Sequence, residues 1–372
     1  MISIKEVAAF FKDKPDGRYT RENSPVPLVN FQKIGNLVQG NYSDIDVWQS
    51  RWTEDACAWR GKIIDIKNSI ILAHPFDKFW NLGEHTATFK KCSNLFNSTS
   101  SVIWEKLDGT LIIIWYGENG WQFATRGCLH YSGKEDHLNF PKLAREVLNE
   151  VSPKWKFLPA SQTYMFELIH PDNRIVTDYG KRRDMVLTGI RADNCNESPH
   201  SVLKYYENIY DFHIPKIVKF NDFDYFMQYV DNYHDLMISE GFVITFENAT
   251  EVLYRVKIKT EQYRIIKRII NGSTPKNMLP KFQNNTFLEF IRECPPEFHG
   301  KLASYGKNVF ARLAIIFNTY KALCNMEAET KKDFAICVQT YVEDDLHKFM
   351  YGLRNNRDIL AMLRKDDLTY YD

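Results

Sequence analysis

The fold is decided by the stretch Trp104-Glu105-Lys106-Leu107-Asp108-Gly109-Thr110-Leu111-Ile112-Ile113-Ile114-Trp115-Tyr116. An Asp-Gly pair before an apolar, β-branched run predicts a turn that leads into a buried strand. Residues 121–125 are the expected hairpin partner of that strand. Lys106 would then lie at the mouth of a sheet, where a lysine can act as a nucleophile if its surroundings favour the neutral amine.

The composition is that of a globular protein large enough for two domains. The chain has 372 residues, 44% of them hydrophobic and 14% aromatic, and its net charge is +1. No global field therefore attracts nucleic acid or membrane, and phosphate binding would have to come from local clusters.

The cysteines and the apolar runs indicate where the protein works. The seven cysteines are widely spaced and form no C-x-x-C pair, which favours reduced thiols over a disulfide framework or a structural zinc. The sequence shows no signal-peptide layout at its start and no apolar run of the roughly 20 residues that a membrane span needs. We expect a soluble protein of the cytoplasm.

The first part of the chain predicts mainly strands with a few helices. A short helix is expected at 1–12, loops over 36–56, and a longer helix at 140–151. Strands are expected at 25–32, 58–66, 70–73, 163–169, 173–176, 185–190, 240–246 and 252–259.

From about residue 265 the pattern becomes helical, with apolar residues three and four positions apart. The segment Asn271-Gly272-Ser273-Thr274-Pro275 is a plausible linker. We therefore predict an α+β protein. A domain of mainly antiparallel sheets with flanking helices spans 1–268, and an all-helical domain spans 269–372.

Several charged residues stand in predicted strands, where burying a charge or placing like charges side by side is costly and calls for an explanation. Glu167 is an acid in an apolar frame, and burying an unpaired carboxylate is costly. Lys257 and Lys259 share one face of a strand, where like charges repel unless an anion lies between them. Cations around a nucleophilic lysine suit a polyphosphate, and two acids suit a ribose and a metal. The full set is Arg60, Lys78, Lys106, Glu167, Glu240, Lys257 and Lys259.

The set resembles the covalent nucleotidyltransferases and, more narrowly, the RNA ligase 1 family, typified by the bacteriophage tRNA-repair ligase. The resemblance covers about the first 265 residues and implies that the first domain is an adenylation domain. Seven blocks in the family's order carry it: 59–63, 77–82, 106–110, 166–169, 173–176, 240–243 and 257–259 with Tyr263.

The resemblance also implies roles for single residues. Lys106 would become adenylylated, Glu167 would hold the ribose, and Glu240 would lie near Mg²⁺ (or Mn²⁺) and contact it through water. Lys257 and Lys259 would contact the phosphates and take part in catalysis. The remaining residues expected to bind ATP are Arg60, Lys78, Asp108, Gly109 and Arg126, which stands where the family often has lysine, with Phe31, Phe79 or Trp80 covering adenine.

The chemistry places a demand on Lys106, because a free lysine amine has a pKa of ~10.4 and is almost wholly protonated at neutral pH. We expect Lys257, Lys259 and a bound metal to lower the pKa of Lys106. The resemblance then implies three steps: formation of lysyl-AMP, transfer of AMP to an RNA 5′-phosphate, and sealing by a 3′-hydroxyl.

The expected partner is RNA with 5′-phosphate and 3′-hydroxyl ends, with nicked tRNA as a hypothesis. A monomer with no membrane partner is expected, acting in the host cytoplasm if the source is viral. A DNA ligase or capping enzyme would share the lysine chemistry but usually appends a strand-rich OB-fold barrel. A non-catalytic RNA-binding protein is the other alternative, disfavoured because buried charges without ligands would only destabilise the fold.

Overall fold

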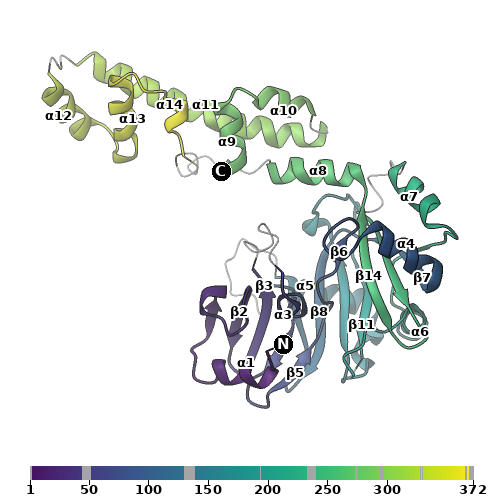
Figure 1. The fold of residues 1–372 in the computed structure, drawn as a ribbon. Helices are drawn as coiled ribbons and strands as arrows, with labels where there is room; N and C mark the ends of the chain where they lie inside the picture. The colour runs from purple at the N-terminus through teal and green to yellow at the C-terminus, as the bar shows by residue number, and fades with distance from the viewer. Residues whose placement is uncertain are drawn as a thin grey trace. The chain divides into compact units, whose positions relative to one another are not determined.

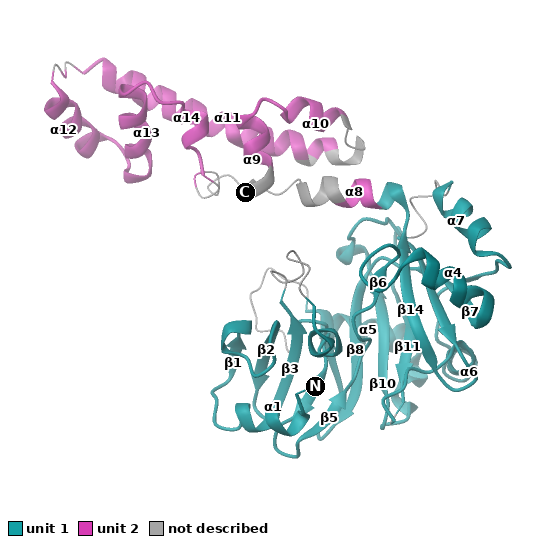
Figure 2. Ribbon diagram, in the orientation of Figure 1, with its two compact units in different colours: residues 1–263 teal, residues 264–372 magenta. Residues whose placement is uncertain are grey.

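A computed structural model describes residues 2–43, 52–129, 139–192, 194–232, 240–272, 275–293, 296–326, 328, 330–364 and 367. The chain divides into two compact units, residues 1–263 and residues 264–372 (Figure 2). Helix α8 (Glu261–Gly272) runs across this division. Two residues of the predicted linker, Ser273 and Thr274, lie outside the described residues.

The described strands of the first unit form three sheets (Figure 1). The first sheet has the order β1 (Gly17–Tyr19), β2 (Val29–Ile34), β3 (Leu37–Tyr42), β4 (Ile63–Asp65), β5 (Ile70–Ala73). The second sheet has the order β11 (Asp184–Arg191), β10 (Thr163–Ile169), β8 (Thr110–Gly117), β9 (Gly120–Thr125). The third sheet has the order β12 (Ile217–Val218), β7 (Ser100–Lys106), β13 (Gly241–Glu247), β14 (Val252–Lys259), β6 (Trp80–Asn81).

Helices cover these sheets with their apolar faces. The helices are α1 (Ile4–Phe11), α3 (Glu54–Ala58), α4 (Phe89–Ser98), α5 (Phe140–Val151), α6 (His200–Tyr210) and α7 (Phe223–Asp231). Helix α5 buries Val147 and Leu148 in the same core as Phe166 of β10. Helices α4 and α7 place Phe96 and Phe226 in the core of the third sheet. The burial of these side chains fixes the two sheets that carry the predicted site residues.

All the regular secondary structure described in the second unit is helical. Its helices after α8 are α9 (Pro275–Gln283), α10 (Phe287–Glu293), α11 (Pro296–Cys324), α12 (Lys331–Tyr341), α13 (Asp344–Arg354) and α14 (Ile359–Met362). Val309 and Ile316 of α11 pack with Phe334 and Phe349 in one core. The α+β fold with a helical second part is therefore confirmed. No strand follows β14 in the described residues, so they contain no OB-fold barrel of the kind that a DNA ligase or capping enzyme usually appends.

Three local predictions are wrong. Residues 36–56 were expected to be loops, but they contain β3 and most of α3. Residues 173–176 were expected to extend a hairpin, yet a 3₁₀ helix occupies Pro171–Asn173 and no strand follows it directly. Of the strand expected at 58–66, only Ile63–Asp65 is extended.

The turn at Asp108-Gly109 also differs from a hairpin. Strands β8 and β9 pair as predicted, from Ile112 opposite Thr125 to the turn at 117–120. Strand β7, however, pairs with β13 in the third sheet, whereas β8 belongs to the second. The segment after Lys106 therefore carries the chain from one sheet to the next.

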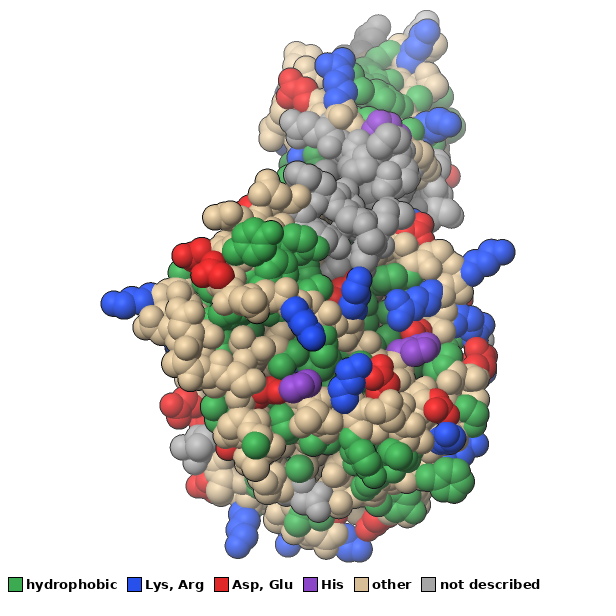
Figure 3. Space-filling view, turned by 90° about the vertical axis from the view of Figure 1, so that its right-hand side faces the viewer, with side chains coloured by type: hydrophobic (Ala, Val, Ile, Leu, Met, Phe, Trp, Pro, Cys, Tyr) green, Lys and Arg blue, Asp and Glu red, His purple; other side chains and the backbone are tan. Residues whose placement is uncertain are grey.

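The surface agrees with the near-zero net charge. In Figure 3, basic and acidic side chains are interspersed over the face shown. Within the part of the chain that the structure describes, no helix is both long and apolar enough to span a bilayer.

Candidate active site

Strand register brings Lys106, Glu240 and Lys259 together. Lys106 ends β7 and lies opposite Gly241 of β13, which lies opposite Lys259 of β14. The backbone N–H of Glu240 donates to the Lys106 carbonyl at 2.9 Å. Gly241 has φ of +143°, and a Cβ there would lie 2.1 Å from the carbonyl oxygen of Ile258. Only glycine fits this close approach of two strands, which sets Glu240 beside the lysines.

The Lys106 amine forms an ion pair with the Glu240 carboxylate, which also pairs with Lys259. The Glu240 side chain is only 6% exposed and that of Lys106 is 20% exposed. Burial alone would lower the pKa of Lys106, but the carboxylates of Glu240, Glu167 and Asp108 outweigh it and raise that pKa. The expected lowering of the Lys106 pKa is therefore wrong for the protein without ligands, because the charges of the three acids outweigh the effect of burial.

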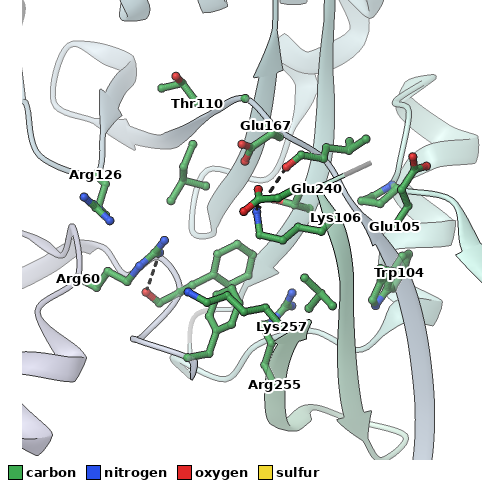
Figure 4. Close-up of a pocket in the computed structure, with 18 of the residues that line it drawn as sticks. Arg60, Trp104, Glu105, Lys106, Thr110, Arg126, Glu167, Glu240, Arg255 and Lys257 are labelled. Atoms are coloured by element: carbon green, nitrogen blue, oxygen red, sulfur yellow. Dashed lines mark hydrogen bonds and ion pairs between the residues drawn. The ribbon is translucent and has the colours of Figure 1, made fainter. Parts of the chain in front are cut away.

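A cavity of about 460 Å³ opens over this ion pair, walled by the second and third sheets (Figure 4). Its charged lining holds three carboxylates and six cations. Those residues are Glu105, Glu167, Glu240, Arg60, Lys106, Arg126, Arg255, Lys257 and Lys259. The apolar lining includes Phe76, Phe79, Trp104, Leu107, Leu111 and Val243. Flat apolar walls with several cations suit a nucleotide that carries phosphates.

Burial and crowding perturb two more groups in this cavity. Burial, reinforced by the charges of Lys78, Lys106 and Lys259, lowers the pKa of Lys257 to about 7. Burial raises the pKa of Glu167 to about 7, although the Lys106 charge opposes the rise. Perturbed groups that share a cavity are typical of functional sites.

Two arginines come from the side of the cavity opposite Lys106 in Figure 4. Arg60 follows α3, and its Nη1 donates to the carbonyl of Phe76 at 3.4 Å. Arg126 follows β9, and its Nη1 donates to the Tyr42 hydroxyl at 2.9 Å. Both guanidinium groups line the cavity, so they are placed to contact an anion that Lys106 also reaches.

Asp108 lies behind the cavity and does not line it. Its side chain accepts hydrogen bonds from the Val176 and Thr177 N–H groups at 2.8 and 2.9 Å and from the Tyr263 hydroxyl at 2.7 Å. The adjacent Gly109 lines the cavity, and a Cβ there would lie 2.4 Å from the Leu168 carbonyl oxygen. Asp108 therefore holds the loop after Lys106 in place, and ligand contact is left to Gly109.

A model of the family described as RNA ligase matches residues 58–263, which is more than half of the chain. The chain belongs to this RNA ligase family. The match contains the residues of the charged cavity lining, from Arg60 to Lys259.

One relative of this chain is the RNA ligase of Rhodothermus phage RM378. The two are 28% identical over 293 residues, which is 63% of this chain and 65% of the phage protein. The chain thus matches less than two thirds of that relative's length. Together with the family match, this likeness supports the resemblance inferred from the sequence.

The sequence identity between this chain and RNA ligases of known structure is low. An archaeal ATP-dependent RNA ligase is 11% identical, with 95% of each chain covered and a TM-score of 0.46. A mutant RNA ligase of Naegleria gruberi, with ATP and Mn, is 16% identical. It covers 46% of this chain and 53% of its own, with a TM-score of 0.36.

Besides Asp108, three more of the residues expected to bind ATP do not line the cavity at Lys106. Phe31 is buried against Trp59 in the core of the first sheet. Lys78 and Trp80 line a second cavity of about 650 Å³. Among the three aromatic candidates for covering adenine, only Phe79 lines the cavity at Lys106, and it lines the second one too.

Sequence reasoning missed Arg255, which lines both cavities. Its guanidinium group lies 4.4 Å from the Phe76 ring centre and pairs with Glu197. The signal was present, because Arg255 stands two residues before Lys257 and shares the strand face of both lysines. Sequence reasoning also missed Glu105 and Thr188, which line the cavity, and Tyr42, which contacts Arg126. No pattern in the sequence singled out these three residues.

Proposed function

We propose that this chain is an ATP-dependent RNA ligase, which joins RNA 3′-hydroxyl and 5′-phosphate ends through a lysyl-AMP on Lys106. The observation that carries the proposal is the Lys106–Glu240–Lys259 cluster, which lies on the floor of a cavity rich in cations. Membership in the RNA ligase family supports the same assignment.

In the first step, the neutral amine of Lys106 attacks the α-phosphorus of ATP. A P–N bond forms, the P–O bond to the leaving pyrophosphate breaks, and the amine gives up its proton to solvent. Lys257 and Lys259 offer positive charge to the phosphates from one side, and Arg60 and Arg126 from the other. Fixed cations at the developing charge stabilise the transition state of phosphoryl transfer.

The nucleoside has matching groups on the wall. Phe79 offers an aromatic ring to adenine, and Val243 offers an apolar side chain from β13. The Glu167 carboxyl can accept a hydrogen bond from a ribose hydroxyl in either protonation state. With its pKa at about 7, Glu167 can stay uncharged beside the nucleotide phosphates for part of the time.

The residues also fit a divalent metal such as Mg²⁺ or Mn²⁺. No group of three or more His, Cys, Asp and Glu side chains in the described residues could hold a metal alone. Mg²⁺ is usually held by one or two carboxylates together with substrate phosphates, and Glu240 and Glu167 would supply them, Glu240 through water. A bound metal would add positive charge near Lys106 and would compete with that amine for Glu240.

In the second step, an oxygen of the RNA 5′-phosphate attacks the phosphorus of lysyl-AMP. A P–O–P linkage forms, the P–N bond breaks, and the released Lys106 amine takes up a proton. In the third step, an RNA 3′-hydroxyl attacks the 5′-phosphorus, loses its proton and displaces AMP. Glu240 is placed to form an ion pair with the Lys106 amine once that amine is protonated again after the second step.

The finer parts of the proposal concern the setting. The RNA substrate is proposed to include nicked tRNA, and the helical second unit is proposed to act in its recognition. The protein is proposed to be a monomer that acts in the cytoplasm, or in the host cytoplasm if it is viral. Sealing of nicked tRNA no faster than of unstructured RNA would contradict the tRNA assignment.

The function is tested by following label from α-³²P-ATP through the protein into a polynucleotide. Lysyl-AMP is isolated, then offered 5′-phosphorylated RNA and DNA of the same sequence. The proposal expects AMP on RNA and a sealed RNA product. Transfer to DNA alone would indicate a DNA ligase, and label taken instead from α-³²P-GTP in a parallel incubation would indicate a capping-type enzyme. RNA binding with no label from either nucleotide would indicate a non-catalytic RNA-binding protein.

A further inference from the structure

The second cavity adjoins the first without containing its nucleophile. It has a volume of about 650 Å³ and shares the wall residues Phe76, Phe79 and Arg255 with the cavity at Lys106. The two cavities are also linked by charge, since Lys78 in the second is the first cation that lowers the pKa of Lys257 in the first. A ligand in the second cavity therefore lies next to the phosphate-binding cations.

The wall of the second cavity presents stacked aromatic rings. The Trp80 and His85 rings lie parallel within 17°, with their centres 4.5 Å apart. Trp52 meets Trp80 edge-on, with ring centres 4.8 Å apart. All three residues line the cavity, and His85 is exposed. A nucleobase that stacks on His85 would extend the existing pair to three rings, which is how proteins bind single-stranded nucleic acid.

The charges around these rings suit a phosphodiester. The Lys78 ammonium lies 4.9 and 4.8 Å from the Trp52 and Trp80 ring centres. Four carboxylates line this cavity, and two of them are neutralised, because Asp77 pairs with Arg191 at 3.2 Å and Glu197 pairs with Arg255; the other two are Glu54 and Glu251. Lys78 has no ion pair among the described residues, so its charge is available to a phosphate.

The chemistry of the second step fixes the direction from which RNA must arrive. Phosphoryl transfer places the attacking and leaving groups in line on opposite sides of phosphorus. Pyrophosphate leaves opposite Lys106 in the first step, and Lys106 leaves in the second. The RNA 5′-phosphate must therefore enter where pyrophosphate departed, on the side of the phosphate-binding cations.

We propose that the second cavity is the subsite for the 5′-terminal nucleotide of the RNA that receives AMP, with its base stacked on the Trp80–His85 pair. This inference rests on the proposed function. During the first step the same space remains open to the departing pyrophosphate, so ATP and RNA use it in turn. The aromatic rings act only on the RNA.

The test separates the base from its phosphate. Wild-type lysyl-AMP is mixed with a 5′-phosphorylated RNA oligonucleotide or with the same oligonucleotide whose first nucleotide lacks its base. AMP transfer is followed in single turnovers for the full-length wild type, His85→Asn and Trp52→Ala. Asparagine is the matched change at residue 85, because φ there is +46° and asparagine tolerates that conformation. Tyr225→Ala removes an aromatic side chain that is 65% exposed and outside the cavity, and serves as control.

The expected result is a loss specific to the base. His85→Asn and Trp52→Ala form lysyl-AMP from ATP at the wild-type rate, and Tyr225→Ala matches the wild type throughout. With intact RNA, His85→Asn transfers AMP at least about fivefold more slowly, as loss of one base–aromatic stack predicts, and Trp52→Ala is also slower than the wild type because Trp80 loses its edge-on neighbour. With the abasic RNA, the wild type is slowed and the variants match it.

Equal losses on both oligonucleotides, no loss on either, or a loss already in lysyl-AMP formation would overturn the subsite. Failure of the proposed function looks different, because the wild type itself would then form no lysyl-AMP or pass none to RNA.

Discussion

Lys106 and Glu240 form an ion pair between neighbouring strands, and the pair raises the pKa of the proposed nucleophile. The protein without ligands therefore holds its amine in the unreactive, protonated form. ATP and a metal would have to shift Glu240 away or outweigh it before the amine could attack. Protecting the amine in this way would keep it from reacting before a nucleotide is bound.

Removing the Glu240 charge should make Lys106 easier to deprotonate. In Glu240→Gln the shape is kept while the acid that raises the Lys106 pKa is lost, so that pKa should fall. The measurement is acetylation of Lys106 against pH in the ligand-free protein, read by mass spectrometry. Lys142, whose side chain is 73% exposed, is the internal reference in the same digests. An unchanged or raised pKa for Lys106 in Glu240→Gln would contradict this account of the pair.

Binding of the nucleotide should charge Lys257. Its pKa of about 7 means that Lys257 is mostly neutral at about pH 8, and an anionic phosphate favours the protonated form. Titration with α,β-methylene-ATP, in buffers of different ionisation enthalpy, should show proton uptake. Lys257→Arg should bind with less uptake, because arginine is already charged in the free protein. Equal uptake by Lys257→Arg and the wild type would show that another group takes the proton.

Glu167 should lower stability in exchange for its role in the site. Because its pKa is raised from 4.5 to about 7, Glu167 is protonated in the folded state and ionised in the unfolded state between those values. Its effect on stability is thus fully adverse above about pH 7 and absent at low pH. Glu167→Gln should stabilise the protein by about 3 kcal/mol at alkaline pH and by little near about pH 4.

The measurement is urea unfolding of the wild type and Glu167→Gln over that pH range, with lysyl-AMP formation assayed alongside. The variant should gain stability and lose activity, as expected where a functional site carries a buried ionisable group. A variant less stable than the wild type at alkaline pH would refute the burial argument.

Tyr263 should stabilise the loop after Lys106 through Asp108. Its hydroxyl donates a hydrogen bond to Asp108. Asp108 is only 4% exposed, and its side chain also accepts hydrogen bonds from two backbone N–H groups. Tyr263→Phe should lower the free energy of unfolding of the first unit by about 1–2 kcal/mol. Chemical unfolding followed by tryptophan fluorescence measures this, and Tyr254→Phe on β14 serves as a matched control. In an Asp108→Asn background, Tyr263→Phe should cost clearly less, and full additivity would show that the two groups are not coupled.

Several charged residues singled out from the sequence share one cavity in the structure, while some of the surrounding elements were predicted wrongly. The elements with strong local patterns, such as the β8–β9 hairpin and α5, were correct. Strand β3 was missed because its interior is polar: Gln39 is buried, and its side chain donates to the carbonyl of Thr125 at 2.8 Å. A hydrogen bond between residues so far apart leaves no local pattern.

The same reason explains the misplaced residues of the site. The resemblance implied a ligand contact for Asp108, but its hydrogen-bond partners Val176, Thr177 and Tyr263 are distant in sequence, so no local pattern showed them. Lys78 and Trp80 stand in one block with Phe79, yet only Phe79 faces the cavity at Lys106. Charges in apolar stretches and the family resemblance singled out the charged set, but which cavity each side chain lines depends on how the sheets pack.

The most direct test of the central claim is to locate AMP on the protein. The full chain is incubated with ATP and Mg²⁺, digested, and searched by mass spectrometry for a peptide that carries AMP, with Lys106→Arg and Lys142→Arg in parallel. The account predicts one acid-labile adduct on Lys106, absent from Lys106→Arg and unchanged in Lys142→Arg. An adduct on any other side chain, or none in the wild type, would contradict it.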